Sequence, residues 1–164
     1  MAWKRISVAC LALAIVVTAA VLSASRSTDA AAPEARKSPR GAEAAATVRH
    51  FGEAEKVEFS WGWIRWLINA ETDPEAEMTF GIVHVDARQK NPRHTHPNSA
   101  EYLHVVSGSC RHLVGNEWVV LKAGDTIRIP PNVPHMAETL DEPMRAVIVY
   151  NTGNRKMVLV DGKE

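Results

Sequence analysis

The chain has 164 residues, enough for one domain, with 19 basic and 19 acidic residues. Lys4 and Arg5 lie in an N-terminal leader, and the sequence from residue 26 onward carries 17 basic and 19 acidic residues. Nucleic-acid binding calls for a basic patch, and attraction to an anionic membrane surface calls for a cluster of Lys and Arg, so this composition argues against both partners.

The first 25 residues have the composition of a secretory signal peptide. Lys4 and Arg5 precede an apolar run over residues 6–22, and the small residues Ser23-Ala24-Ser25 follow it. A short basic start, an apolar centre and a small-residue exit are the parts of such a peptide. We therefore expect cleavage near residues 24–27 and export to the periplasm or the medium. The alternative is an uncleaved membrane anchor, because residues 6–22 approach the ~20 apolar residues that span a bilayer.

Residues 26–46 are rich in Ala, Pro, Ser and charge and contain no large apolar residue. Such a segment cannot bury enough apolar surface to offset the entropy lost on ordering, so we expect a disordered linker. Removal of the leader takes Cys10 with it and leaves Cys110 as the only cysteine. A single thiol excludes an intrachain disulfide, and we expect Cys110 to be a small buried residue on a strand rather than a reactive thiol.

From residue 47 to residue 164 we expect one all-β domain. Short stretches of strand composition are separated by turn residues, and there is no long amphipathic helix. Gly115-Asn116 is typical of a two-residue hairpin turn. Many short strands indicate a sandwich or a barrel. The expected strands are 57–68, 78–86, one beginning at 94, 101–107, 111–114, 117–121, 126–129, 135–139, 144–150 and 157–160.

Four residues in this domain are our candidate metal ligands: His94, His96, Glu101 and His135. Side chains two positions apart on a strand point to the same face, so His94 and His96 can act together. A downstream carboxylate and a histidine from a later strand can complete a shell of three nitrogens and one oxygen. Such a shell suits one divalent transition metal ion, namely Fe, Mn, Cu, Ni or Zn.

The spacing around these residues resembles the two motifs of the cupin superfamily. The first motif has His-x-His, four residues, Glu, six residues and Gly, and here it runs from His94 to Gly108. The second has Gly, five residues, Pro-x-Gly, two residues and His, and here it runs from Gly124 to His135. The resemblance implies a jelly-roll barrel of short antiparallel strands around one metal ion. Cupins include oxygenases, decarboxylases, isomerases, lyases and binding proteins, so the fold does not give the reaction.

Two positions depart from the glycines of these motifs. Asn132 replaces the Gly of Pro-x-Gly, and Arg88 stands six residues before His94, where Gly is usual. Asn is the non-glycine residue that most readily adopts a left-handed backbone, so we expect a positive φ at Asn132. We expect Arg88 to lie at the mouth of the barrel.

The other four histidines have different expected roles. His84 lies on a strand expected to line the pocket, and with Glu101 it is our candidate for moving a proton during catalysis. His104 lies three residues after Glu101 and therefore on the opposite face of its strand, where we expect a structural or surface residue. We expect His50 and His112 to be solvated.

Three tryptophans, Trp61, Trp63 and Trp66, fall within one expected strand. Alternation places Trp61 and Trp63 on one face and Trp66 on the other. One face would join the core and the other would be covered by a partner subunit, which favours a homodimer; a ligand-stacking platform is the alternative. Arg65 shares the face of Trp63, at the barrel mouth or beside a substrate carboxylate. Tyr150 is a further pocket candidate.

Together these features predict an exported, metal-dependent cupin enzyme that acts on a small organic molecule, and the resemblance favours oxygenase chemistry. Three imidazoles and one carboxylate leave one or two metal positions open to a substrate or water. The alternatives are isomerase or lyase chemistry on a sugar or hydroxy acid, and a non-catalytic cupin that binds a metal or small molecule.

Overall fold

The computed structural model describes residues 47–160 and 162, which belong to one compact unit of the chain. The predicted signal peptide at 1–25 and the predicted linker at 26–46 lie outside the described residues. All regular elements of the described part are strands, and no helix there is long and apolar enough to cross a membrane. The prediction of an all-β domain is confirmed.

The first sheet has six strands, each antiparallel to its neighbours. Its central strands alternate buried and more exposed residues, as expected for a sheet with one face on the core. In order across the sheet the strands are β1 (Lys56–Phe59), β2 (Gly62–Ile68), β3 (Thr79–Val85), β10 (Met144–Tyr150), β5 (Glu101–Ser107) and β8 (Thr126–Ile129).

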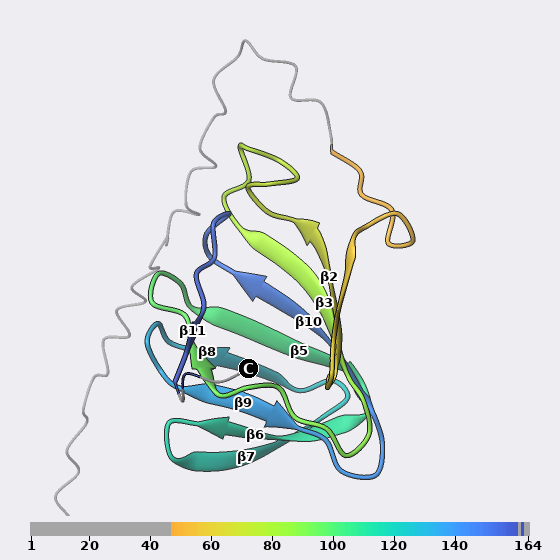
Figure 1. Ribbon diagram of the computed structural model, residues 1–164, viewed down its shortest axis with the longest axis vertical. Helices are drawn as coiled ribbons and strands as arrows, with labels where there is room; N and C mark the ends of the chain where they lie inside the picture. The colour runs from red at the N-terminus through yellow and green to blue at the C-terminus, as the bar shows by residue number, and fades with distance from the viewer. Residues whose placement is uncertain (1–46, 161, 163–164) are drawn as a thin grey trace, which may run out of the picture. The chain divides into compact units, whose positions relative to one another are not determined.

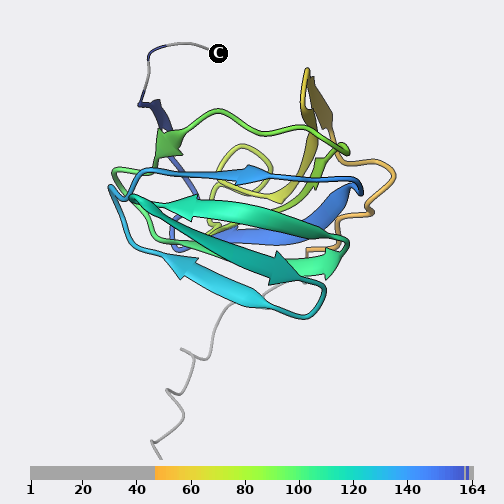
Figure 2. The same ribbon diagram turned by 90° about the horizontal axis from the view of Figure 1, so that it is seen from below.

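The second sheet has five antiparallel strands. In order they are β11 (Val158–Leu159), β4 (His94–Thr95), β9 (His135–Glu138), β6 (Ser109–Val114) and β7 (Glu117–Lys122). The two sheets are the walls of one barrel (Figures 1 and 2). This architecture agrees with the cupin jelly roll that the sequence predicts.

The core lies between the sheets and consists mainly of inward-facing aliphatic residues of the first sheet. Val85, Val105, Met144 and Ala146 are essentially inaccessible to solvent. Burial of each Val or Met side chain contributes about 1.5–3 kcal/mol to folding. At one end of β3, β10 and β5 the buried residues Thr79, Tyr150 and Glu101 carry polar groups instead. The apolar core therefore supports a polar site at that end of the sheet.

The predicted strand over 57–68 is wrong in one respect, because a two-residue turn at Ser60-Trp61 divides it into β1 and β2. Phe59 pairs with Gly62 across this turn. Gly62 has a φ of 144°, and a Cβ there would lie 2.1 Å from the carbonyl oxygen of His84. Only glycine fits this position, so Gly62 fixes both the turn and the close approach of β2 to β3.

The predicted hairpin over Gly115-Asn116 is confirmed, with Val114 of β6 paired to Glu117 of β7. The predicted positive φ at Asn132 is also confirmed, at 63°. The backbone N–H of Asn132 donates to the carbonyl oxygen of His96 at 3.0 Å, so this turn ties the second motif to the first.

Candidate metal centre

Three strands bring the four predicted ligands together. His94 begins β4, His96 follows this strand, Glu101 begins β5 and His135 begins β9. His94 and His135 are direct partners in the ladder between β4 and β9. All four side chains are buried, and one ligand atom from each lies within 4.8 Å of all the others. The first sheet supplies only the carboxylate, and the second supplies the imidazoles.

The orientation of the three imidazoles is fixed by the backbone. A carbonyl oxygen can only accept a hydrogen bond, so a ring nitrogen beside it must carry the proton. The second nitrogen, Nε2, is then left with a lone pair directed at the centre, as in metal-bound histidines. In each case Nδ1 donates to a backbone carbonyl oxygen: that of Pro92 for His94 at 2.8 Å, that of Lys156 for His96 at 2.7 Å and that of Val133 for His135 at 2.8 Å.

The Nε2 atoms of His96 and His135 face the carboxylate of Glu101, which is also a hydrogen-bond acceptor. Oε2 of Glu101 lies 3.0 Å from Nε2 of His135 and 3.2 Å from Nε2 of His96. Burial acts to raise the pKa of Glu101, but His135 and His96, in the form that carries a second proton on Nε2, outweigh it by hydrogen bonds and charge and hold that pKa well below its usual range. Without that proton an ionised carboxylate faces bare imidazole nitrogens and a cation must lie between them, so the donor set fits a divalent metal ion.

The imidazoles have different proton affinities. Burial, with a smaller contribution from the charge of His135, lowers the pKa of His94 to about 4. Burial also acts to lower the pKa of His135, but the hydrogen bond and charge of Glu101 raise it overall. His94 is therefore a neutral ligand over the physiological range, and metal binding at His135 competes with a proton that Glu101 favours.

Of the two candidates for proton transfer, Glu101 lies at the centre and His84 does not. The ring of His84 is stacked on Trp63 at 5.2 Å between centroids, and its Nε2 lies 3.1 Å from Asp86. Val83 and Val85, the neighbours of His84 on β3, point into the core. His84 therefore occupies the outer face of its strand. The sequence already indicated this face, because residues 83 and 85 are both valines and alternation places the residue between them on the opposite side of the strand.

The remaining histidines also divide into exposed residues and one buried residue. His104 is exposed on the outer face of β5, as predicted, with Nδ1 2.8 Å from the hydroxyl of Thr126. His50 is exposed, as predicted. The prediction for His112 is wrong, because its side chain is only 2% exposed and points inward from β6. Arg111 precedes it and is exposed, so a charged residue beside it was the signal that His112 faces the interior.

A cavity of about 790 Å³ opens beside the centre. His94, Glu101 and His135 form part of its wall, and most of the rest is apolar, including Trp61, Ile64, Trp66, Val83, Leu103 and Ile148. Both sheets contribute to this lining. The metal ligands therefore border a space large enough for a small organic molecule, which is the usual form of a ligand site: apolar with a few placed polar groups.

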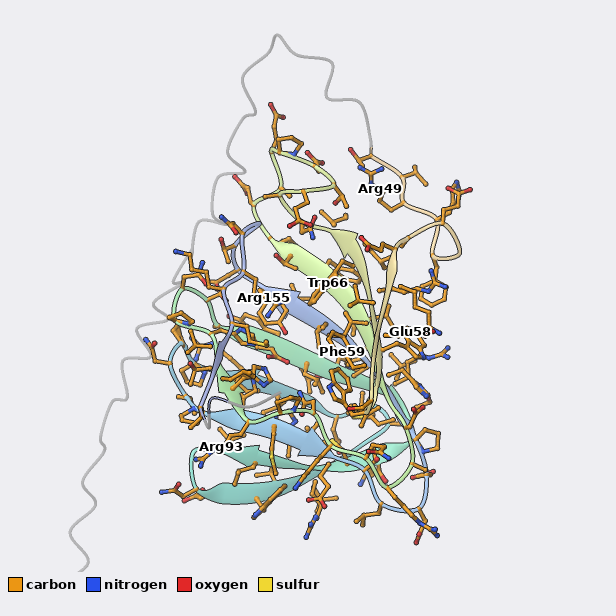
Figure 3. The ribbon with its side chains drawn as sticks, viewed as in Figure 1. Arg49, Glu58, Phe59, Trp66, Arg93 and Arg155 are labelled. Atoms are coloured by element: carbon orange, nitrogen blue, oxygen red, sulfur yellow. The ribbon has the colours of Figure 1, made fainter. Side chains whose placement is uncertain are left out.

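Two arginines and a tyrosine add polar groups to this wall. Arg93 precedes β4, and Arg155 lies between β10 and β11 (Figure 3). The guanidinium of Arg155 lies over the rings of Trp66, at 4.7 Å, and Tyr150, at 5.2 Å. Burial, reinforced by the charge of Glu101, raises the pKa of Tyr150 well above its usual range. Tyr150, a predicted pocket residue, keeps its phenolic proton.

The predicted arrangement of the tryptophans is confirmed for Trp63 and Trp66, which lie on opposite faces of β2, and wrong for Trp61. Trp61 lies in the turn before β2, so it points into the core, as does Trp66, and only Trp63 occupies the outer face. Arg65 shares this outer face and donates to the carbonyl oxygen of Ala54, away from the cavity. The two-residue turn removes Trp61 from the alternation of β2, which is the cause of the error.

Arg88 is likewise not a pocket residue. It is exposed, has a φ of 61°, and donates to Asp141 through Nη2 at 3.0 Å. It takes the backbone conformation that glycine usually takes at this position, while its side chain points to solvent.

Comparisons with known proteins agree with this architecture. Residues 81–150 match the family model of the Cupin domain. A protein of Streptomyces coelicolor described as uncharacterized is 25% identical over 99 residues, which cover 60% of this chain and 88% of that protein. The family match spans β3 to β10 and includes all four residues of the centre.

The fold also resembles solved oxalate decarboxylases. That of Lactobacillus farciminis, in a formate complex, has a TM-score of 0.63 and 23% identity over 68% of this chain and 35% of its own. That of Bacillus subtilis, at pH 4.6, has a TM-score of 0.61 and 21% identity over 68% of this chain and 31% of its own. The chain spans about a third of the length of these enzymes, and at this identity the likeness shows the fold alone.

Proposed function

We propose that this protein, whose residues 81–150 form a cupin domain, is a metal-dependent enzyme that acts on a small organic acid. One observation carries the proposal. Three imidazole nitrogens and a carboxylate converge at the wall of a cavity of about 790 Å³, so these residues would hold a metal beside a space that a substrate can enter. A structural metal site would instead be closed by protein ligands on all sides.

The charge of the cavity favours an acidic substrate. Glu101 faces the metal ligands, and Glu58, at the edge of the wall, is paired with Lys56 at 2.5 Å. Arg155 has no ion pair with an acidic residue in the described part of the chain. A substrate carboxylate matches a guanidinium in charge and in geometry. The apolar remainder of the wall accommodates the carbon skeleton and excludes water from it.

Within this class we favour oxygenase chemistry. A divalent iron, copper or manganese ion at the centre would supply a redox-active Lewis acid that holds both substrate and dioxygen. The apolar wall would shield the reacting carbon from water, Arg155 would orient the carboxylate, and Tyr150 would donate its retained proton as a hydrogen bond. Lyase or decarboxylase chemistry is the second candidate, supported by the structural likeness to oxalate decarboxylases.

The test is metal analysis followed by turnover. Protein purified from its own compartment is analysed for metals and then assayed with small aromatic and aliphatic carboxylic acids in an oxygen electrode. We expect about one redox-active metal per chain and oxygen uptake matched by loss of one acid. Loss of an acid without oxygen uptake would replace the oxygenase by a lyase or decarboxylase. Stoichiometric metal with no turnover of any acid would support a binding protein instead.

We further propose that the enzyme acts outside the cytoplasm. The support is the leader, with its basic start, apolar run and small-residue exit. N-terminal sequencing of protein from the periplasm or the medium should give a first residue near 24–27. Recovery of full-length chain in the membrane fraction would instead make residues 6–22 an anchor.

A further inference from the structure

His112 is a buried histidine beside the centre that does not belong to it. It faces Ala137 in the ladder between β6 and β9, two positions along β9 from His135. Its ring lies 6.0 Å from the ring of His135 between centroids, with an angle of 17° between the planes. It also lines the cavity. His112 is thus held at a fixed place on the same wall as the metal ligands, but outside the cluster of possible ligand atoms.

Both ring nitrogens of His112 lack a hydrogen-bond partner among the residues that the structure describes. The three imidazoles of the centre differ in this respect, because each donates Nδ1–H to a carbonyl oxygen. A buried polar group without a partner destabilises the folded protein, because it has lost its hydrogen bonds to water without replacing them. An aliphatic residue at position 112 would avoid this cost and would suit the ladder partners Val119 and Ala137, so stability does not account for a histidine here.

A buried imidazole in its neutral form offers one N–H donor and one bare nitrogen acceptor. His112 is one of the residues that line the cavity, whose wall both sheets form and whose volume of about 790 Å³ has room for an organic molecule. The group that satisfies these nitrogens therefore enters through the cavity. It needs a donor or acceptor atom at some distance from the atom that binds the metal.

We propose that His112 is a second polar anchor for the substrate, which makes the substrate an organic acid with a hydroxyl group separated from its carboxylate by an apolar skeleton. The carboxylate binds at the metal and the hydroxyl binds at His112. His112 thereby selects hydroxylated acids over their unsubstituted counterparts. This inference rests on the proposed function, because it assumes a metal with an open position toward the cavity.

The test uses benzoate and its three monohydroxylated isomers, the 2-, 3- and 4-hydroxybenzoates, as probes. The full chain is loaded with Co²⁺, whose visible absorption changes when a carboxylate coordinates, and dissociation constants are measured by titration. We expect one isomer to bind at least ~10-fold more tightly than benzoate, since it gains a buried hydrogen bond at His112 that benzoate leaves unmade. Replacement of His112 by Phe should remove this preference and leave benzoate binding within about twofold.

Two further variants guard against an indirect effect. The conservative substitution His112→Gln keeps a donor and an acceptor and should retain part of the preference. His104→Phe makes the same change on the exposed face of β5 and should retain all of it. Cobalt content is measured for each variant and should be unchanged, because His112 is not a ligand.

The possible failures are distinct. If all three hydroxybenzoates bind wild type no better than benzoate, or if the preference survives in His112→Phe, the inference is overturned and the proposed function stands. If cobalt binds in a 1:1 ratio but no carboxylate alters its spectrum, the metal has no open position, and the proposed function falls together with the inference.

Discussion

The inner and outer faces of the barrel use histidine in opposite ways. On the inner face, His94, His96 and His135 are buried, and each has one nitrogen bound to a backbone carbonyl and the other directed at Glu101. On the outer face, His84 and His104 interact with side chains near solvent. The partner of the second nitrogen, rather than the presence of an imidazole, therefore distinguishes a ligand from a surface residue.

The largest expected effect comes from removing one inner imidazole. His135→Ala should weaken metal binding by more than ~100-fold, since loss of a supporting contact alone costs 10–100-fold. His104→Ala removes the same ring from the outer face and should leave metal content unchanged. Elemental analysis of both variants after dialysis measures the contrast. Equal metal loss in the two would erase the distinction between the faces.

Chelation should destabilise the folded protein by an amount that grows with the logarithm of the metal affinity. The buried carboxylate and imidazoles lose their cation, whereas the outer face is unaffected. At free metal 100 times the dissociation constant, the metal contributes about 2.7 kcal/mol to the free energy of unfolding. Thermal unfolding over a series of buffered metal concentrations should show this dependence. A midpoint that is independent of metal concentration would contradict it.

The inner face should also suppress the reactivity of its thiol. Cys110 is buried on β6, and burial raises its pKa to about 11 from the usual 9.0. Alkylation of Cys110 at pH 8 should be at least ~100-fold slower in the folded than in the unfolded protein, because the thiolate is the nucleophile. Between pH 9 and 11 the unfolded thiol loses its proton first, so stability falls as pH rises through this window. Peptide mapping that finds rapid labelling of folded Cys110 would place it outside the core.

The smallest effect concerns the turn that leads into β9. Asn132 has a φ of 63° and binds the carbonyl of His96 through its N–H. Asn132→Gly should be neutral or slightly stabilising, whereas Asn132→Val should cost about 1 kcal/mol or more. Denaturant unfolding of the two variants, with metal present and absent, measures the difference. Unchanged stability of Asn132→Val would show that this backbone strain is absent in solution.

Much of the centre follows from sequence because its rules are local. The pair at His94 and His96, the carboxylate at Glu101 and the late His135 have fixed spacings, and the turn at Asn132 needs a residue that tolerates positive φ. The hairpin over Gly115-Asn116 is likewise determined by two adjacent residues. Local signals of this kind do not depend on how distant strands pair.

The predictions that are wrong share a cause: each placed a residue on the wrong face of its strand relative to the core. The turn at Ser60-Trp61 moves Trp61 out of the alternation of β2, and no charged residue marks that break. His84 and His112 were each assigned to the wrong face because polar residues occur on both faces of this barrel. Their true faces follow from the residues beside them, because Val83 and Val85 point into the core on either side of His84 and Arg111 points to solvent beside His112.

Anomalous diffraction at the absorption edge of the metal found in the purified protein tests the central claim most directly. We expect a single peak about 2.0–2.2 Å from Nε2 of His94, His96 and His135 and from a carboxylate oxygen of Glu101. A peak bound by His84 or His104, or the absence of any peak among the four inner residues in protein that carries stoichiometric metal, would contradict the account.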